Sequence, residues 1–336
     1  MAQHRYRQCS VERTLAVMGD PWGFLILRAA FFGLRKHGEI RQQGAIPGKI
    51  LAARLKALVA AGVLTRRQYQ EHPPRFTYRL TEQGHDLYLP AVALMHWGDR
   101  WMAGSQGAPV RLTHASCGRS FHALVACPHC RQELDIQAVT YRDGPGAGLG
   151  RRPAGRRNRR SPAPAIYQRG RPCSVARALG VVADRWVFLI MREACFGARR
   201  FEEFRSRTGI ARNILADRLQ RLVAAGLLRK AQYLQRPARF EYRLAEKGRS
   251  LYQAILALLA WGDRWLAGPK GPPLLLTHSA CGRDFEPQVL CSACGGSISS
   301  RQVRYREMFR SRGGAARGSA GGGGPRQPIR QRAGAT

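Results

Sequence analysis

Residues 201–228 read FEEFRSRTGIARNILADRLQRLVAAGLL, and this stretch decides the fold. A short helical segment ends at Gly209, and the spacing predicts a second helix from Arg212 to Ala225, which Gly226 stops. Apolar side chains recur along this second helix as they do on one buried helix face. They are Ile214, Leu215, Leu219, Leu222 and Val223. Two short helices joined by a tight turn are the arrangement of a helix-turn-helix.

The other faces of the second helix carry polar and small side chains, which suit the base edges and phosphates of a DNA major groove. An ordinary solvated helix has a similar composition, so the next segment matters. Residues 227–244, LLRKAQYLQRPARFEYRL, contain two β-rich runs around a Pro/Arg-rich turn. A hairpin directly after such a helix is a wing, and its Arg239 is expected to enter the minor groove or hold a phosphate.

The whole pattern occurs twice in the chain. Each tryptophan has a partner 164 residues away, in the pairs Trp22/Trp186, Trp97/Trp261 and Trp101/Trp265. The string LVAAG occurs at 58 and 222, and WGDRW at 97 and 261. We therefore predict two tandem copies of one unit, Cys9–Arg142 and Cys173–Arg306. The first wing, LTRRQYQEHPPRFTYRL, carries Arg75 where the second has Arg239.

Two helices are predicted before the helix-turn-helix of each unit, and one long helix after the wing. The first is amphipathic, with Ser10 or Ser174 as its N-cap. The second ends at Gly33 or Gly197 and is apolar enough to be buried. The long helix carries an apolar stripe that favours a partner helix, although packing on its own domain would also fit. The stripe consists of Leu87, Ala91, Leu94 and Trp101 in the first unit and Leu251, Ile255, Leu258 and Trp265 in the second.

The 336 residues include 56 Lys and Arg against 21 Asp and Glu, a net charge of +35. Such a charge favours acidic partners. A hydrophobic content of 44% supports two folded domains and excludes global disorder. The sequence has no membrane-spanning run and no signal peptide, so we expect a cytoplasmic, nucleoid-associated protein. No phosphate-binding glycine loop, Ser/His/Asp set or carboxylate pair recurs between the units, which argues against an enzyme.

Together, SVERTLAVMGDPWGFLILR, GIARNILADRLQRLVAAGLL, PPRFTYRLTEQG and WGDRW resemble the HxlR-type winged helix-turn-helix transcription regulators, a bacterial family related to the MarR-type regulators. The resemblance covers Cys9–Trp101 and Cys173–Trp265. It implies sequence-specific binding of double-stranded DNA, usually as a homodimer on a near-palindromic operator. The first unit departs from the family at Pro21, where a basic residue is favoured, and in LRKHGEI, which stands where the second unit has RRFEEF. We therefore expect it to bind DNA less well or to read a different half-site.

The duplication, together with the resemblance, predicts that the two units pair inside one chain as a covalent pseudo-dimer covering both half-sites. Further homodimerisation is left open. The alternative function is a zinc-containing RNA-binding or protein-adaptor module with basic tails. The predicted DNA contacts are Lys49, Arg54, Lys56, Arg75, Arg212, Asn213, Arg218, Gln220, Arg221 and Arg239.

In a reducing compartment the nine cysteines point first to metal ligation or thiol chemistry, not to disulfides. Each unit contains the motif H-x2-C-x9-C-x2-C. Its H-x2-C and C-x2-C pairs, called knuckles below, carry the ligand types that bind tetrahedral zinc. Four protein ligands close the shell, so we expect one structural zinc in each unit, two per chain. Buried cysteines without metal, or a redox thiol cluster, are the alternatives. The predicted ligands are His114, Cys117, Cys127 and Cys130, and His278, Cys281, Cys291 and Cys294.

Cys9 and Cys173 precede the first helix of each unit, where the helix N-terminus and a nearby arginine would lower a thiol pKa. They are candidate redox thiols, although a packing role fits the same position. Cys195 lies in an apolar helix and is expected to be an inert core residue.

The predicted fold is mainly α with small β elements, and consists of two tandem winged helix-turn-helix domains, each followed by a small zinc-ribbon-like module. The predicted boundaries are an N-terminal extension at 1–8, winged-helix domains at 9–103 and 173–267, ribbon modules at 104–142 and 268–309, an Arg/Gly/Pro-rich linker at 143–172 and a disordered Gly/Arg-rich tail at 310–336.

Overall fold

The computed structural model describes residues 6–7, 9–150, 166, 169 and 172–308. Most of the predicted linker, from 151 on, and the whole predicted tail lie outside the described residues. The first repeat contains β1 (Tyr6–Arg7), α1 (Ser10–Met18), α2 (Pro21–Phe31), α3 (His37–Gly44), α4 (Gly48–Ala60), β2 (Leu64–Gln70), β3 (Arg75–Leu80), α5 (Glu82–Asp86), α6 (Tyr88–Met102), the 3-10 turn η1 (Gly104–Gln106), β4 (Val110–His114), β5 (Ser120–Phe121), β6 (Ala123–Ala126), β7 (Val139–Asp143) and β8 (Leu149–Gly150). The second contains α7 (Ser174–Val182), α8 (Arg185–Cys195), α9 (Phe201–Thr208), α10 (Arg212–Ala224), β9 (Leu228–Leu234), β10 (Arg239–Leu244), α11 (Glu246–Leu266), β11 (Leu274–His278), β12 (Arg283–Phe285), β13 (Gln288–Cys291) and β14 (Val303–Glu307). Among the helices of these segments, none combines the length and apolarity needed to cross a membrane.

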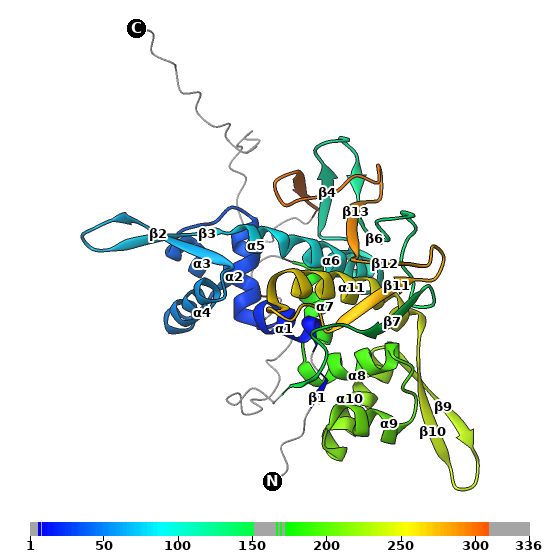
Figure 1. Cartoon of the computed structure of the whole chain (residues 1–336). Helices are drawn as coiled ribbons and strands as arrows, with labels where there is room; N and C mark the ends of the chain where they lie inside the picture. The colour runs from blue at the N-terminus through cyan, green and yellow to red at the C-terminus, as the bar shows by residue number, and fades with distance from the viewer. Residues whose placement is uncertain (1–5, 8, 151–165, 167–168, 170–171, 309–336) are drawn as a thin grey trace.

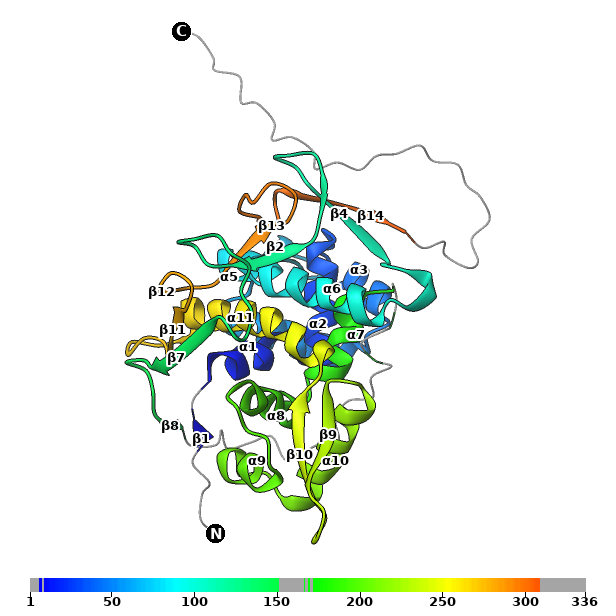
Figure 2. The same cartoon turned by 90° about the vertical axis from the view of Figure 1, so that its right-hand side faces the viewer.

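Helices of both repeats form the centre of the molecule (Figures 1 and 2). There α1 packs on α11, α7 packs on α6, and α6 and α11 lie side by side. Much of the apolar stripe predicted for the long helices is buried here, with Leu87, Leu94, Leu251 and Leu258 at most 2% exposed. Each long helix therefore packs against helices of the other repeat, because the duplication places two matching apolar faces on one polypeptide.

The serines at the starts of α1 and α7 bond across the repeats. The residue before each serine occupies the N-cap position, so the predicted serine caps are wrong by one residue. Ser10 Oγ donates to Asp263 Oδ1 at 2.5 Å, and Ser174 Oγ donates to Asp99 Oδ1 in the same way. Burial raises the pKa of both carboxyl groups to about 6, and the serine hydroxyls counteract only part of this effect.

Close contact between these helices depends on two glycines. A Cβ on Gly98 would lie 2.4 Å from the carbonyl oxygen of the first residue of α7, and a Cβ on Gly262 would lie 2.4 Å from that of the first residue of α1. The adjacent tryptophans, Trp97 and Trp261, donate from Nε1 to backbone carbonyls of the opposite repeat at 3.0 and 3.1 Å. The WGDRW motif thus supplies part of the contact between the repeats.

The long helix after the wing is continuous only in the second repeat. There α11 spans 21 residues. In the first repeat the same stretch is divided into α5 and α6, with Leu87 between them. Pro90 lacks the N–H that would bond to the carbonyl of Asp86, whereas its counterpart Ala254 has one.

Each winged-helix domain matches the predicted order of elements. Leu215, Leu219 and Leu222 of α10 are at most 1% exposed, and α10 packs on α8 as α4 packs on α2. Gly209 ends α9 in the left-handed conformation at φ 66, as a tight turn before α10 requires. The wings are the antiparallel pairs β2–β3 and β9–β10.

The strands that follow the long helices pair across the repeats. β4 pairs with its own β5 and with β14, β11 pairs with its own β12 and with β7, and β6 pairs with β13. The sequence predicted one separate ribbon module per repeat. In the described residues the strands of the two repeats are instead combined in shared sheets. Since α6 and α11 lie side by side, the segments that leave them run close together, and each short strand completes its hydrogen bonds on the other repeat.

Ordered structure continues past the predicted module boundary at 142. Gly144 N–H donates to the carbonyl of Pro273, and Gly146 N–H to that of Pro272, both at 3.0 Å. A Cβ on Gly144 would lie 2.3 Å from the Pro272 oxygen, so this approach requires glycine. β8 then pairs with β1. Residues 143–150, predicted as linker, are thus part of the folded structure.

Candidate DNA interface and metal clusters

The second helices of the two helix-turn-helix motifs, α4 and α10, lie on the side of the helical centre away from strands β4, β6 and β13 (Figure 1). Small side chains on α4, such as Ala52 and Ala53, leave its backbone open to close approach. Several predicted contacts occupy these exposed surfaces, where they can reach phosphates and base edges. They are Lys49, Lys56, Arg212, Asn213, Gln220 and Arg221.

Two predicted DNA contacts face the domain interior instead. Arg54 Nη2 lies 2.9 Å from Asp20 Oδ1, and Arg218 Nη2 lies 3.0 Å from Asp184 Oδ2. The arginine side chains are only 29% and 14% exposed. Both aspartates are N-caps, of α2 and α8, and accept from the backbone of the first helical turn. Arg54 and Arg218 therefore fix the second helix of the motif to the domain core, and their prediction as DNA contacts is not supported by their position.

Two arginines of α10 form exposed ion pairs. Arg212 lies 2.8 Å from Glu202 and is 68% exposed, and Arg221 lies 3.1 Å from Asp217 and is 62% exposed. Exposed pairs of this kind contribute about 0–1 kcal/mol, so a phosphate group can replace the carboxylate at little cost. Both side chains stay available to DNA.

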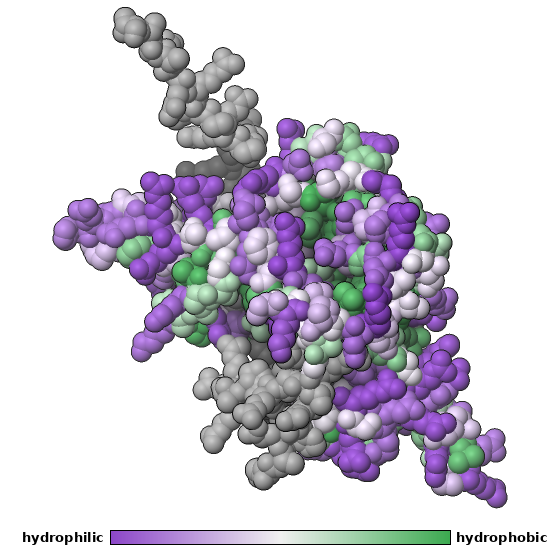
Figure 3. Space-filling view, in the orientation of Figure 1, coloured by the Kyte–Doolittle hydropathy of each residue, from purple (hydrophilic) through white to green (hydrophobic). Residues whose placement is uncertain are grey.

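Arg75 and Arg239 are the first residues of the second wing strands and are exposed. They stand next to the turns at the wing tips. The wings project from opposite ends of the molecule as largely hydrophilic extensions (Figures 1 and 3). Each arginine is thus placed where a wing reaches the DNA backbone or the minor groove beside a bound helix.

The wings also carry basic residues that the sequence reasoning missed. Lys230 Nζ lies 3.9 Å from the ring centroid of Phe240, and the Arg66 guanidinium lies 4.3 Å from that of Phe76. The aromatic rings hold these cations along the hairpin surface. Because basic residues occupy consecutive positions in LTRRQYQ and LLRKAQYL, the strand pattern held a signal for them. The exposed set is Arg66, Arg67, Arg229 and Lys230.

The eight predicted metal ligands form two clusters, each with all ligand atoms within 4.8 Å of one another. Their grouping differs from the one predicted, because each cluster takes its H-x2-C knuckle from one repeat and its C-x2-C knuckle from the other. The strands that pair across the repeats place the knuckles of one repeat next to those of the other. The clusters are His114, Cys117, Cys291 and Cys294, and Cys127, Cys130, His278 and Cys281.

The distances within the clusters fit a tetrahedral metal ion. Cys127 Sγ lies 3.8 Å from Cys281 Sγ, and His278 Nδ1 lies 3.2 Å from Cys130 Sγ and 3.5 Å from Cys281 Sγ. In the other cluster a histidine nitrogen and a sulfur lie 3.4 Å apart. Zinc bonds of about 2.3 Å to sulfur and about 2.0–2.1 Å to nitrogen give tetrahedron edges of about 3.5–3.8 Å. Each cluster could therefore hold a metal ion of this kind.

All four knuckles have the same turn. The residue after the second ligand is in the left-handed region, at φ 61–68, and its N–H donates to the carbonyl of the first ligand at 2.8–2.9 Å. Such tight turns direct backbone N–H groups toward the sulfurs. The backbone of Arg119 in this way lowers the pKa of Cys117 to about 6, aided by His114 and Cys294. The turn residues are Gly118, Arg131, Gly282 and Gly295.

The two cysteines before α1 and α7 have different surroundings. Cys9 is 4% exposed and lies within hydrogen-bond reach of the buried Arg192 of the other repeat. Cys173 is only partly buried and lines an apolar cavity together with Arg28. Burial raises the pKa of Cys195 to about 12, which fits the inert role predicted for it.

Exposed basic helices, each followed by a basic wing and mounted on a shared helical centre, define a DNA-binding transcriptional regulator. The HxlR-like helix-turn-helix family model matches residues 17–106 and 181–269. The chain belongs to this family, whose members are regulators and not enzymes.

Individual relatives agree with this family. An uncharacterised HTH-type transcriptional regulator of Mycobacterium tuberculosis, Rv3095, is 47% identical over 130 residues, 39% of this chain and 82% of the relative. Another, sll1512 of Synechocystis, is 32% identical over 97 residues, 28% of this chain and 70% of the relative. The crystal structure of PA1607 is 34% identical and covers 39% of this chain and 92% of its own, with a TM-score of 0.36. Each match spans about one repeat of this chain.

Proposed function

We propose that one chain binds both halves of a near-palindromic operator, with its two winged-helix domains acting as a covalent pseudo-dimer. The supporting observation is the packing of α6, α7, α1 and α11 within the chain, including matching bonds from Ser10 to Asp263 and from Ser174 to Asp99. These contacts are reciprocal between the repeats, as contacts are at the interface of a two-fold dimer. A single chain then presents two DNA-binding surfaces at a fixed separation, one formed by α4 and its wing and the other by α10 and its wing.

The two DNA-binding surfaces differ in the side chains that they offer to DNA. The exposed face of α10 offers Arg212, Asn213, Gln220 and Arg221, whereas that of α4 offers Lys49 and Lys56 among alanines. Amide and guanidinium groups make bidentate bonds to bases, and lysines act more as point charges. We therefore propose that both repeats read a half-site, the second by more base contacts, and the first less strictly and with a larger share of phosphate contacts.

We further propose that each Cys3His cluster binds one zinc ion with a structural role. The ligand types, their spacing and the tight turn of each knuckle support metal binding. A structural role follows because a shell of four protein ligands leaves no position for a reactive water. Because each cluster uses ligands from both repeats, two zinc ions would hold the pseudo-dimer together beside its helical contacts. Redox sensing through Cys9 or Cys173, and any pairing of two whole chains, stay predictions.

Selection of bound duplexes from a random library, with the full chain as bait, tests the proposal. We expect two half-sites about one helical turn apart, about 10–10.5 base pairs centre to centre, bound by one chain in native mass spectrometry. One half-site per chain would contradict the pseudo-dimer. Equal, salt-sensitive binding to every duplex, or a preference for single-stranded RNA at matched salt, would contradict sequence-specific operator binding.

A further inference from the structure

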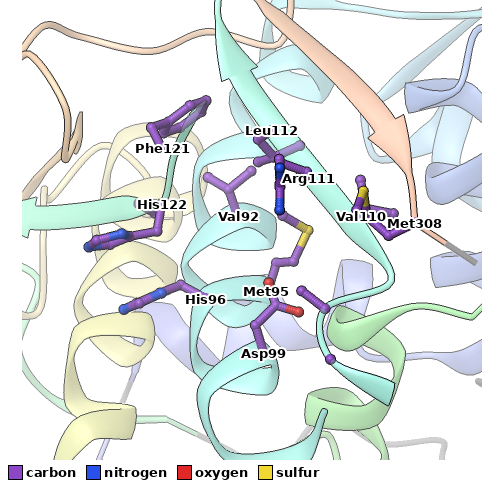
Figure 4. Close-up of a pocket in the computed structure, with 13 residues that line it drawn as sticks. Val92, Met95, His96, Asp99, Val110, Arg111, Leu112, Phe121, His122 and Met308 are labelled. Atoms are coloured by element: carbon purple, nitrogen blue, oxygen red, sulfur yellow. The ribbon is translucent and has the colours of Figure 1, made fainter. Parts of the chain in front are cut away.

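A cavity of about 380 Å³ lies between α6 and the strands that follow it in the first repeat. We propose that it binds a small aromatic carboxylate. Figure 4 shows His96 and His122 together on one side of the cavity, Met308 on the opposite side and Asp99 at one end. The volume lies within the range of about 300–1,000 Å³ that is usual for small-ligand sites. Most of the lining comes from α6 and from the segment Val110–Leu112 of β4.

The apolar part of the lining favours a flat aromatic body. Val92 and Leu112 are buried aliphatic side chains, and Phe121 adds a ring. Met95 of α6 and Met308, the residue after β14, contribute two thioethers, and thioether sulfur makes favourable contacts with aromatic rings. An aliphatic ligand of the same size would gain less from such a lining.

Arg111 is the cationic group in the lining and favours a carboxylate, whereas the carboxyl group of Asp99 lines the same cavity at one end (Figure 4). Arg111 of β4 is exposed and lines the same cavity, where its guanidinium can donate two parallel hydrogen bonds to a carboxylate. His96 stacks on His122 with ring centroids 4.3 Å apart. Burial lowers the pKa of His96 to about 4, so this ring is neutral and offers hydrogen bonds without a second charge.

The corresponding place in the second repeat has a different lining. His96, Arg111 and His122 are replaced there by Ala260, Leu275 and Glu286. The Gly144 and Gly146 backbone also packs against Pro272 and Pro273 on that side. The two histidines and the arginine of this lining therefore have no counterparts of the same type in the second repeat, and the expected stoichiometry is one ligand per chain.

The cavity also borders the contact between the repeats. Asp99 lines it and at the same time accepts the hydrogen bond from Ser174 at the start of α7. A ligand in this cavity would touch α6 at the point where the second repeat is attached.

Isothermal titration calorimetry of the full chain with 1-naphthoate tests the proposal without DNA. We expect saturable binding of one naphthoate per chain and binding of 1-naphthalenemethanol at least about tenfold weaker, because the uncharged alcohol loses the charge-assisted bond. Arg111→Leu, which copies the residue of the second repeat, should weaken naphthoate binding at least about tenfold. Val92→Leu, which also copies that repeat, should weaken it by narrowing the cavity.

Leu275→Arg is the matched control and should leave naphthoate binding unchanged, since it alters the equivalent position outside this cavity. Circular dichroism of each variant verifies the fold. The proposal is overturned by absence of saturable binding, by two equivalents per chain, or by unchanged affinity in folded Arg111→Leu. None of these outcomes depends on whether the chain binds an operator as proposed.

Discussion

Cys130 Sγ lies 3.2 Å from His278 Nδ1, although 148 residues separate them along the chain. The two residues belong to different repeats. The C-x2-C knuckle with Cys130 therefore shares a cluster with the H-x2-C knuckle of the second repeat, and not with that of its own repeat. Metal binding at such a cluster requires both repeats to be folded and in place. The association of the two DNA-binding domains and the occupancy of the clusters are therefore linked.

Pairs of Cys→Ser substitutions distinguish the observed clusters from one site per repeat. Cys127→Ser with Cys281→Ser removes two ligands of one cluster, so native mass spectrometry should find one zinc remaining. Cys117→Ser with Cys127→Ser removes one ligand from each cluster, and both zinc ions should be lost or weakly held. If the second pair retained one tightly bound zinc, the ligands would group within repeats and the observed clusters would be wrong.

Arg212→Ala and Arg218→Ala should have different effects despite their places on the same helix. Arg218 is 14% exposed and pairs with the N-cap Asp184, so its loss should lower the free energy of unfolding by about 1–3 kcal/mol. Arg212 is 68% exposed, so its loss should leave stability within about 0.5 kcal/mol and weaken operator binding instead. Thermal unfolding and DNA titration of both variants measure the two effects. Equal melting temperatures would contradict the interior role of Arg218.

Arg239→Ala tests the wing. We expect operator binding to weaken by about 1–3 kcal/mol if Arg239 touches a base, and the salt slope to fall by about one if it touches only phosphate. Arg283→Ala removes an equally basic, exposed residue from β12, which belongs to neither a wing nor a helix-turn-helix, and serves as the control. A wing variant that behaves like this control in both measurements would remove the wing from the interface.

The contact between the repeats should depend on pH. Burial raises the pKa of Asp99 and Asp263 to about 6, above their ordinary value of 3.8. The folded state thus favours the protonated carboxyl, and this stability is present below about pH 4 and lost as pH rises through 6. Asp99→Asn keeps an acceptor for Ser174 without the charge, so it should stabilise the chain by about 1–3 kcal/mol at pH 7.5.

The same substitution should have little effect on stability at low pH, where the wild-type carboxyl is already protonated. Chemical denaturation of both proteins at pH 4 and pH 7.5 gives the difference directly. A stabilisation that is equal at the two pH values would show that the buried charge is not its cause.

Gly98→Ala should destabilise the chain by about 2–4 kcal/mol, because the new Cβ would meet a backbone oxygen at 2.4 Å and force α6 away from α7. Gly38→Ala is the matched control, since its Cβ has no neighbour within 4 Å and lies in helix α3. It should be neutral or stabilise by up to about 1 kcal/mol. If both variants had the same free energy of unfolding, close packing at Gly98 would not matter.

Several features followed from local sequence alone. The period of Leu215, Leu219 and Leu222 predicted the buried face of α10, and Gly209 predicted the turn before it. The exposure of an arginine side chain was harder to predict where the residue borders the buried face of its helix. Arg218 is one residue from a buried leucine, and only the position of Asp184, 34 residues earlier, turned it inward. The cavity beside Arg111 had no sequence signal, because its lining comes from four separate elements.

The sequence by itself determined the helices, the wings, the duplication and the eight candidate metal ligands, because each depends on residues near one another in the chain. It did not determine which knuckle joins which. The prediction of one cluster inside each repeat is wrong, because both repeats offer the same ligands at the same spacing and the spacing alone cannot distinguish a partner in the same repeat from one in the other. The tertiary structure decided this. With α6 and α11 side by side, β4 meets β14, β11 meets β7 and β6 meets β13, so the nearest complementary knuckle is the one on the other repeat.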